Sequence, residues 1–155
     1  MKFNYYAFRA IYLHEMDRFR RTLMQSLFSP VLSTSLYFIV FGSVIGGYVE
    51  KIDGISYGSF IVPGLLMLTL LTQSISNTSF GIFFPKFNGT IYEILAAPIS
   101  TFEIVLAFVG AGATKTLLVG VVIFITATFF VEVQVMYPLL MIFLLVLVAF
   151  TFALF

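Results

Sequence analysis

Long apolar runs separated by short polar segments dominate the chain after its first 21 residues. Three of these runs contain no charged residue, and a fourth contains only Lys115. A helix needs roughly 20 apolar residues to span the hydrocarbon of a bilayer, and in lipid its backbone groups must be satisfied within the segment. The pattern therefore predicts four transmembrane helices. The predicted spans are about 27–49, 59–84, 104–130 and 138–155.

Residues 5–24 have a different, amphipathic pattern. Apolar residues recur there at spacings of three and four, the period of a helix: Tyr5, Phe8, Tyr12, Met16, Phe19 and Leu23. Most charged residues of the segment, including Arg18, Arg20 and Arg21, fall on the other side. Such a helix is typical of the membrane–water interface, where it contacts lipid. We predict an in-plane interface helix here; the alternative is a basic flank that merely precedes the first span.

The polar segment 85–103, between the second and third predicted spans, has the pattern of a short structured loop. Thr90 followed by Glu93 predicts a capping box at a helix start, and Ser100 followed by Glu103 predicts a second one. Between them a helix of about two turns can form, and Pro98 would end it because proline has no N–H to continue the helical hydrogen bonds. We therefore predict a short helix held between two membrane spans, as in a docking element.

The second predicted span is unusually polar in its middle. Gln73 and Asn77 are the most polar of a group of hydroxyl and amide side chains there. Amides are costly in lipid unless they find partners across a helix interface or face a wet cavity. Two interpretations stay open, polar contacts between helices and the lining of a translocation path, and both predict that these side chains point toward the protein interior.

Lys115 is the one charge in the third predicted span. An ammonium at this depth must extend to the interface, pair with an acid or face water. Extension to the interface is the simplest interpretation, and an interior position, together with Gln73 and Asn77, is the other.

Composition, charge and motifs exclude several classes of protein. The 155-residue chain is 61% hydrophobic and 10% charged, with a mean hydropathy of +1.09, whereas a soluble domain is about 25% charged. A net charge of +1 gives no concentrated basic patch for nucleic acid. The segment 110–116 resembles a phosphate-binding loop, but such a loop with its lysine at Lys115 needs glycine at the positions of Val109 and Thr114. We find no catalytic or metal-ligand constellation, so the sequence does not predict an enzyme.

The basic residues indicate an orientation. One Lys or Arg, Lys51, lies on one side of the predicted membrane, and six lie on the side of the N-terminus and the 85–103 loop. These six are Lys2, Arg9, Arg18, Arg20, Arg21 and Lys86. Because cytoplasmic loops carry an excess of Lys and Arg, the N-terminus and the loop are predicted to be cytoplasmic.

Two segments carry a family resemblance. YGSFIVPGLL, which contains Tyr57, Phe60, Pro63 and Gly64, and GTIYEILAAPIS, at 89–100, resemble the second-span entry and the cytoplasmic loop of ABC-2 type transporter permeases. The resemblance extends over residues 1–155 and is strongest to bacterial inner-membrane permeases of the drug, lipid or polysaccharide export type.

The resemblance implies an all-α, multi-pass bundle that pairs with a second permease copy and with cytoplasmic ATPase subunits. ATP would bind the partner subunits, and this chain would need no cofactor of its own. The loop would be a coupling helix that contacts the ATPase. The implied contact residues are Thr90, Glu93, Ile94, Leu95 and Pro98.

The resembled permeases have six spans, whereas this sequence stops within its fourth. A non-transporting membrane scaffold, or a non-functional fragment of a permease, is therefore an alternative hypothesis. The sequence does not specify the substrate.

Overall fold

The computed structural model describes residues 4–41, 51–52, 55–131 and 136–155. Within these ranges the regular secondary structure is helical, as the composition predicts, apart from a two-stranded hairpin. The helices are α1 (Tyr5–Arg21), α2 (Leu23–Ile39), α3 (Tyr57–Phe87), α4 (Ile91–Ala96), α5 (Thr101–Phe130) and α6 (Pro138–Leu154). The strands β1 (Lys51–Ile52) and β2 (Ile55–Ser56) pair antiparallel, Lys51 with Ser56 and Ile52 with Ile55.

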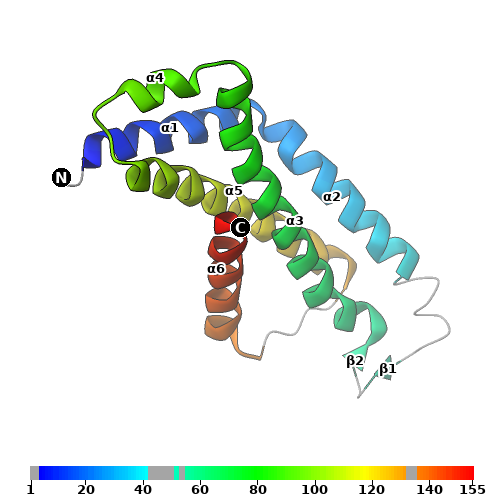
Figure 1. Cartoon of the computed structure of the whole chain (residues 1–155). Helices are drawn as coiled ribbons and strands as arrows, with labels where there is room; N and C mark the ends of the chain where they lie inside the picture. The colour runs from blue at the N-terminus through cyan, green and yellow to red at the C-terminus, as the bar shows by residue number, and fades with distance from the viewer. Residues whose placement is uncertain (1–3, 42–50, 53–54, 132–135) are drawn as a thin grey trace.

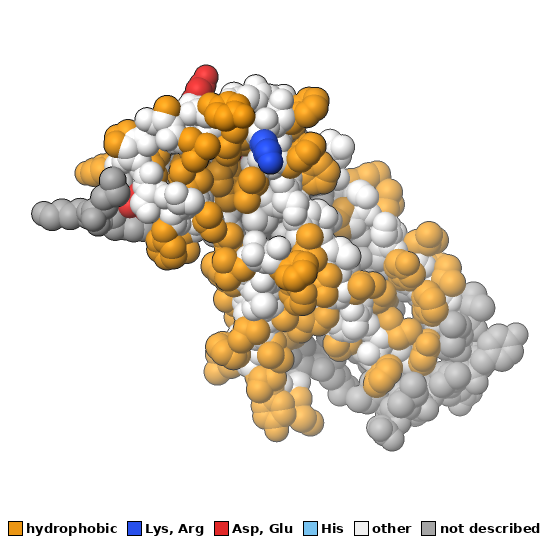
Figure 2. Space-filling view, in the orientation of Figure 1, with side chains coloured by type: hydrophobic (Ala, Val, Ile, Leu, Met, Phe, Trp, Pro, Cys, Tyr) orange, Lys and Arg blue, Asp and Glu red, His pale blue; other side chains and the backbone are white. Residues whose placement is uncertain are grey.

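Helices α3 and α5 are long and apolar enough to cross a membrane, by length and composition. Helices α2 and α6 are shorter apolar helices, and residues 42–49 of the first predicted span lie outside the described residues. Large apolar side chains are exposed over much of the surface (Figure 2), for example Phe129, Leu139 and Phe143, which are 83%, 83% and 65% exposed. A surface of this kind suits a lipid environment better than water.

Helix α5 is the centre of the structure, with α1, α2, α3 and α6 packed around it (Figure 1). Three apolar clusters follow one another along it. The residues of α5 in these clusters are Val109 and Ala113 (with Ala149 and Ala153 of α6), Val119 and Ile123 (with Phe19 of α1), and Ala127 (with Phe38 of α2 and Val62 of α3). The predicted third span is therefore shielded on several sides by other helices.

Helices α3 and α5 approach closely because small residues of α5 face α3. A Cβ atom at Gly120 would lie 2.7 Å from Leu70 Cδ2, and one at Gly112 would overlap Thr78 Oγ1. The buried face of α3 repeats every three or four residues: Val62, Leu66, Leu70, Ser74, Thr78 and Gly81. Glycine at 112 and 120 thus lets the backbones meet at a distance that larger residues would prevent.

The second predicted span ends later than we expected. Helix α3 continues through Pro85 to Phe87, although the sequence predicts a loop from Pro85. The fixed φ of proline is compatible with a helix, and the turn that follows is still closed by Asn88 N–H, which donates to Phe84 O at 3.0 Å. Gly89, with a φ of 79°, ends the helix in the left-handed conformation that glycine favours.

Candidate functional site

Helix α4 lies in the connection between α3 and α5, at the end of the molecule where α1 lies (Figure 1). The predicted Thr90–Glu93 capping box is wrong. Thr90 has φ −66° and ψ −14° and caps no backbone N–H; its hydroxyl donates to Pro85 O at 3.3 Å. An N-cap residue has non-helical, usually extended, dihedrals, so a helical Thr90 cannot turn its hydroxyl toward Glu93 N–H.

The side chains of α4 point mostly away from the protein. None of its residues is buried; Tyr92 and Leu95 are 72% and 57% exposed, and Ile94 is half-buried. Glu93 is exposed. In the described part of the chain its carboxylate forms no ion pair and accepts no hydrogen bond. The helix ends at Ala96, where Ala97 becomes extended before the exposed Pro98, as the sequence predicts.

The second predicted capping box is confirmed at the start of α5. Ser100 N–H donates to Glu103 Oε2 at 2.9 Å, and Ser100 Oγ accepts from Phe102 N–H at 3.3 Å. The other oxygen of the same carboxylate accepts from Asn4 N–H. Glu103, which is 3% exposed, therefore joins the first residues of α1 and α5, a contact that the local sequence pattern does not reveal.

Lys115 forms a buried ion pair with Glu15 of α1. Its Nζ donates to Glu15 Oε2 at 2.7 Å, and the two side chains are 4% and 3% exposed. The interpretation in which Lys115 extends to the interface is wrong, because α1 covers this part of α5 and brings a carboxylate to the ammonium. The interior position that we considered for Lys115 is the one observed.

Our division of α1 into an apolar and a charged face missed Glu15. Glu15 lies three residues after Tyr12 and four before Phe19, so it belongs to the face that packs on α5. Met16 is next to this face and only half-buried. A lone acid on an apolar stripe, together with a lone lysine in a span, is the signal from which the pair is predictable.

The three arginines that we predicted to contact the membrane interface, Arg18, Arg20 and Arg21, differ in their surroundings. Arg18 Nη2 lies 3.0 Å from the same Glu15 oxygen, and its guanidinium carbon is 6.0 Å from the centre of the Phe84 ring in α3. Arg20 and Arg21 are exposed. Their contact with a membrane surface stays a prediction.

The polar residues in the middle of α3 make contacts between helices. Asn77 Nδ2 donates to Thr116 Oγ1 of α5 at 3.4 Å, and Ser74 Oγ donates to Ala149 O of α6 at 2.6 Å. Asn77 and Gln73 are both half-buried. Thr78 Oγ1 is buried and has no hydrogen-bond partner among the described residues. These contacts support the interhelical interpretation for Asn77.

The part of the chain that the structure describes contains no group of three His, Cys, Asp or Glu side chains that could hold a metal ion. The charged side chains that this part of the chain does bring together are Glu15, Arg18 and Lys115.

Comparison with known proteins gives a consistent result. A family model described as ABC-2 type transporter matches residues 6–155. The chain is 40% identical over 129 residues to the inner membrane transport permease YadH of Escherichia coli K12. The aligned region covers 83% of this chain and 50% of that protein. The protein of the same name from Shigella flexneri matches equally. The chain thus spans about half the length of these relatives. No solved structure matches.

Proposed function

The chain belongs to the ABC-2 type transporter family, and from this premise we propose that it forms the membrane-spanning part of an ATP-driven exporter in which α4 is the coupling helix. The ATP would be bound and hydrolysed by separate cytoplasmic subunits. The motion of those subunits would reach the spanning helices through the α3–α4–α5 connection.

The observation that carries this proposal is the exposure of α4. A six-residue helix between the two longest apolar helices has no buried residue, and its exposed side chains include Tyr92, Leu95 and Glu93. Exposed aromatic and aliphatic side chains next to one charge are typical of a small protein-binding surface. The capping box at Ser100 and the bond from Asn4 to Glu103 connect the loop to α5 and α1. A displacement of α4 would therefore be transmitted to these two helices.

The orientation supports the same assignment. With six basic residues on the side of α4 and one on the other, α4 is expected in the cytoplasm of a bacterial cell. There it is accessible to a soluble ATPase. We propose that two copies of the permease assemble with the ATPase, and that the substrate is a drug, a lipid or a polysaccharide-like molecule. The names of the relatives specify transport and the inner membrane, and nothing about the substrate.

Site-specific photocrosslinking tests the assignment. A photoreactive amino acid at Leu95, in cells that carry the transporter, is expected to capture a protein whose peptides contain the ATP-binding motifs of an ABC ATPase. The control position is Phe129, which is 83% exposed and, near the other end of α5, about 40 Å along that helix from its start. Capture of the ATPase from Phe129 but not from Leu95 would assign the coupling surface to the opposite side. Capture from neither would favour a membrane scaffold.

A further inference from the structure

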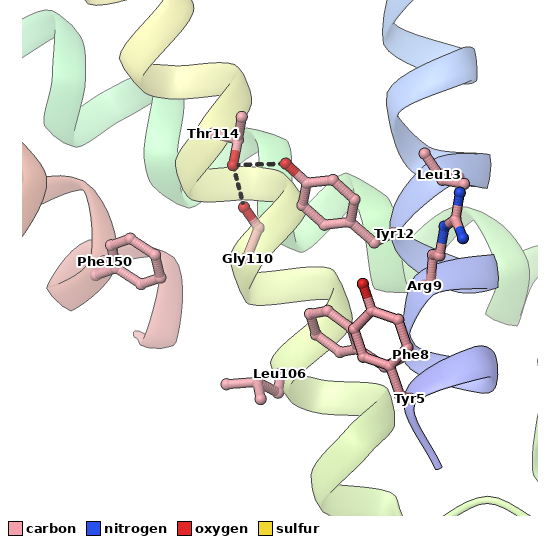
Figure 3. A pocket seen from close by; sticks show the side chains of 9 residues that line it. All are labelled: Tyr5, Phe8, Arg9, Tyr12, Leu13, Leu106, Gly110, Thr114 and Phe150. Atoms are coloured by element: carbon pink, nitrogen blue, oxygen red, sulfur yellow. Dashed lines mark hydrogen bonds between the residues drawn. The ribbon is translucent and has the colours of Figure 1, made fainter.

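A groove at the junction of α1, α5 and α6 is not explained by ATPase coupling. Its volume is about 550 Å³, within the range of about 300–1,000 Å³ typical of ligand sites. Figure 3 shows its lining: Tyr5, Phe8, Arg9, Tyr12 and Leu13 of α1, Leu106, Gly110 and Thr114 of α5, and Phe150 of α6. The groove is open on one side, so a ligand can enter from the surroundings of the bundle.

The polar groups of Tyr12, Gly110 and Thr114 on the floor of the groove already have hydrogen-bond partners. Tyr12 Oη donates to Thr114 Oγ1 at 3.0 Å, and Thr114 Oγ1 donates to Gly110 O at 2.8 Å (Figure 3). The rings of Phe8 and Tyr12 are stacked, with their centres 6.2 Å apart. The floor therefore offers a ligand mainly carbon surface, which favours an apolar occupant.

Arg9 is the one charged side chain in the lining. It is exposed and makes no ion pair within the described residues. The carboxylates of Glu15 in α1 and Glu103 in α5 bind other groups. In Figure 3 Arg9 lies on one side of the groove and Phe150 on the other. A ligand that fits has an anionic end and an apolar tail.

We propose that this groove binds an anionic phospholipid, with its phosphate at Arg9 and an acyl chain along Leu106 and Phe150. A free phosphate ion would leave the carbon-lined floor in contact with water, and a lipid without an anionic group would leave the guanidinium without a counter-ion. In a zwitterionic lipid the choline ammonium would compete with the guanidinium for the phosphate of its own headgroup. Only an anionic amphiphile satisfies both parts of the site. Its position beside an amphipathic helix agrees with this, because such helices lie where headgroups and acyl chains meet.

Tryptophan fluorescence offers a direct test, since the chain contains no tryptophan. We place one at Phe150 in the groove, and in a second protein at Phe143, which is 65% exposed on the same helix. Each is reconstituted into nanodiscs of mixed phosphatidylglycerol and phosphatidylcholine in which either the one lipid or the other is brominated, and the quenching at equal mole fractions gives the relative affinity of the two lipids. We expect roughly a fivefold preference for phosphatidylglycerol at position 150, as one arginine at a membrane surface provides, and none at position 143.

Arg9→Gln in the Phe150→Trp protein is expected to abolish this preference, while the matched change Arg20→Gln, at an exposed arginine of α1 outside the groove, is expected to leave it intact. Equal quenching by both lipids at position 150, or a preference that survives Arg9→Gln, would overturn the proposal. So would weak quenching by both lipids there with normal quenching at position 143, because a second copy or a further protein segment would then fill the groove. The experiment uses no ATPase and the same lipid mixture in both leaflets, so its outcome is independent of the coupling and orientation proposals.

Discussion

Lys115 Nζ and Glu15 Oε2 lie 2.7 Å apart although 100 residues separate them in the sequence. Their pair is buried between α1 and α5, and the nearby bond from Tyr12 to Thr114 and the bond from Asn4 to Glu103 connect the same two helices. Helix α1 is therefore joined to the first half of α5 at three places along its length. We expect α1 and this part of α5 to move together during any transport cycle.

The first prediction concerns the charge balance of this cluster. Glu15→Gln leaves two cations, Lys115 and Arg18, without their shared carboxylate, whereas Lys115→Met leaves Glu15 still paired with Arg18. Breaking a buried ion pair from one side costs about 3–5 kcal/mol. We expect Glu15→Gln to approach this cost and Lys115→Met to cost less, as measured by unfolding of the purified protein in mixed micelles.

The double variant Glu15→Gln, Lys115→Met provides the matched comparison, because it removes the buried ammonium together with the carboxylate. It is expected to be more stable than Glu15→Gln alone. If Lys115→Met is the more damaging single change, the arginine does not share the carboxylate in solution and the cluster is described wrongly.

The second prediction distinguishes Thr90 from Ser100, since each is followed by a glutamate three residues later and each therefore resembles an N-cap in the sequence. Ser100→Ala removes a real N-cap and is expected to cost about 0.5–2 kcal/mol of stability at the start of α5. Thr90→Ala removes only an exposed bond to Pro85 O, and is expected to change stability by less than about 0.5 kcal/mol. Amide hydrogen exchange in the first turns of α4 and α5 measures both; equal deprotection of the two helices would contradict the structure.

The third prediction concerns the contact between α3 and α5. Gly112→Ala places a methyl group against Thr78, whose backbone Cα would lie 3.4 Å away, and overpacking of this kind typically costs about 1–3 kcal/mol. Gly64→Ala is the control, since a Cβ there meets nothing within 4 Å, and we expect it to be neutral or slightly stabilising. Thermal unfolding in detergent compares the two.

A second-site change sharpens this test. Thr78→Ala removes a buried hydroxyl that has no hydrogen-bond partner, and is expected to be tolerated alone and to recover part of the loss in Gly112→Ala. Full tolerance of Gly112→Ala in the presence of Thr78 would mean that the helices lie farther apart than the structure has them.

Local patterns in the sequence predicted helices in the parts of the chain that the structure describes as helical, although α3 ends later than predicted. The capping box at Ser100 and the stop at Pro98 depend on residues within one turn, so they could be predicted. The Thr90 box could not, because Thr90 follows the left-handed Gly89 in the turn that ends α3, and α3 itself continues past Pro85 to Phe87. The Glu15–Lys115 pair depends on how α1 packs on α5, and a helical period gives the packed face of one helix without naming the partner.

The last prediction tests the coupling surface by removing exposed side chains that are not needed for folding of the chain. The Glu93 carboxylate makes no intramolecular bond among the described residues, and Leu95 is 57% exposed, so Glu93→Ala and Leu95→Ala are expected to leave folding and membrane insertion unchanged. An apolar anchor at a protein interface is worth upward of about 1 kcal/mol, which corresponds to roughly fivefold to tenfold in affinity. We expect each change to weaken ATPase binding to the nanodisc-embedded transporter by about that factor.

Asp17→Ala, which removes an exposed acid from α1, is the control for a nonspecific loss of charge and should leave binding unchanged. Normal binding by the Glu93→Ala, Leu95→Ala double variant would mean that α4 is only a connection between two spans.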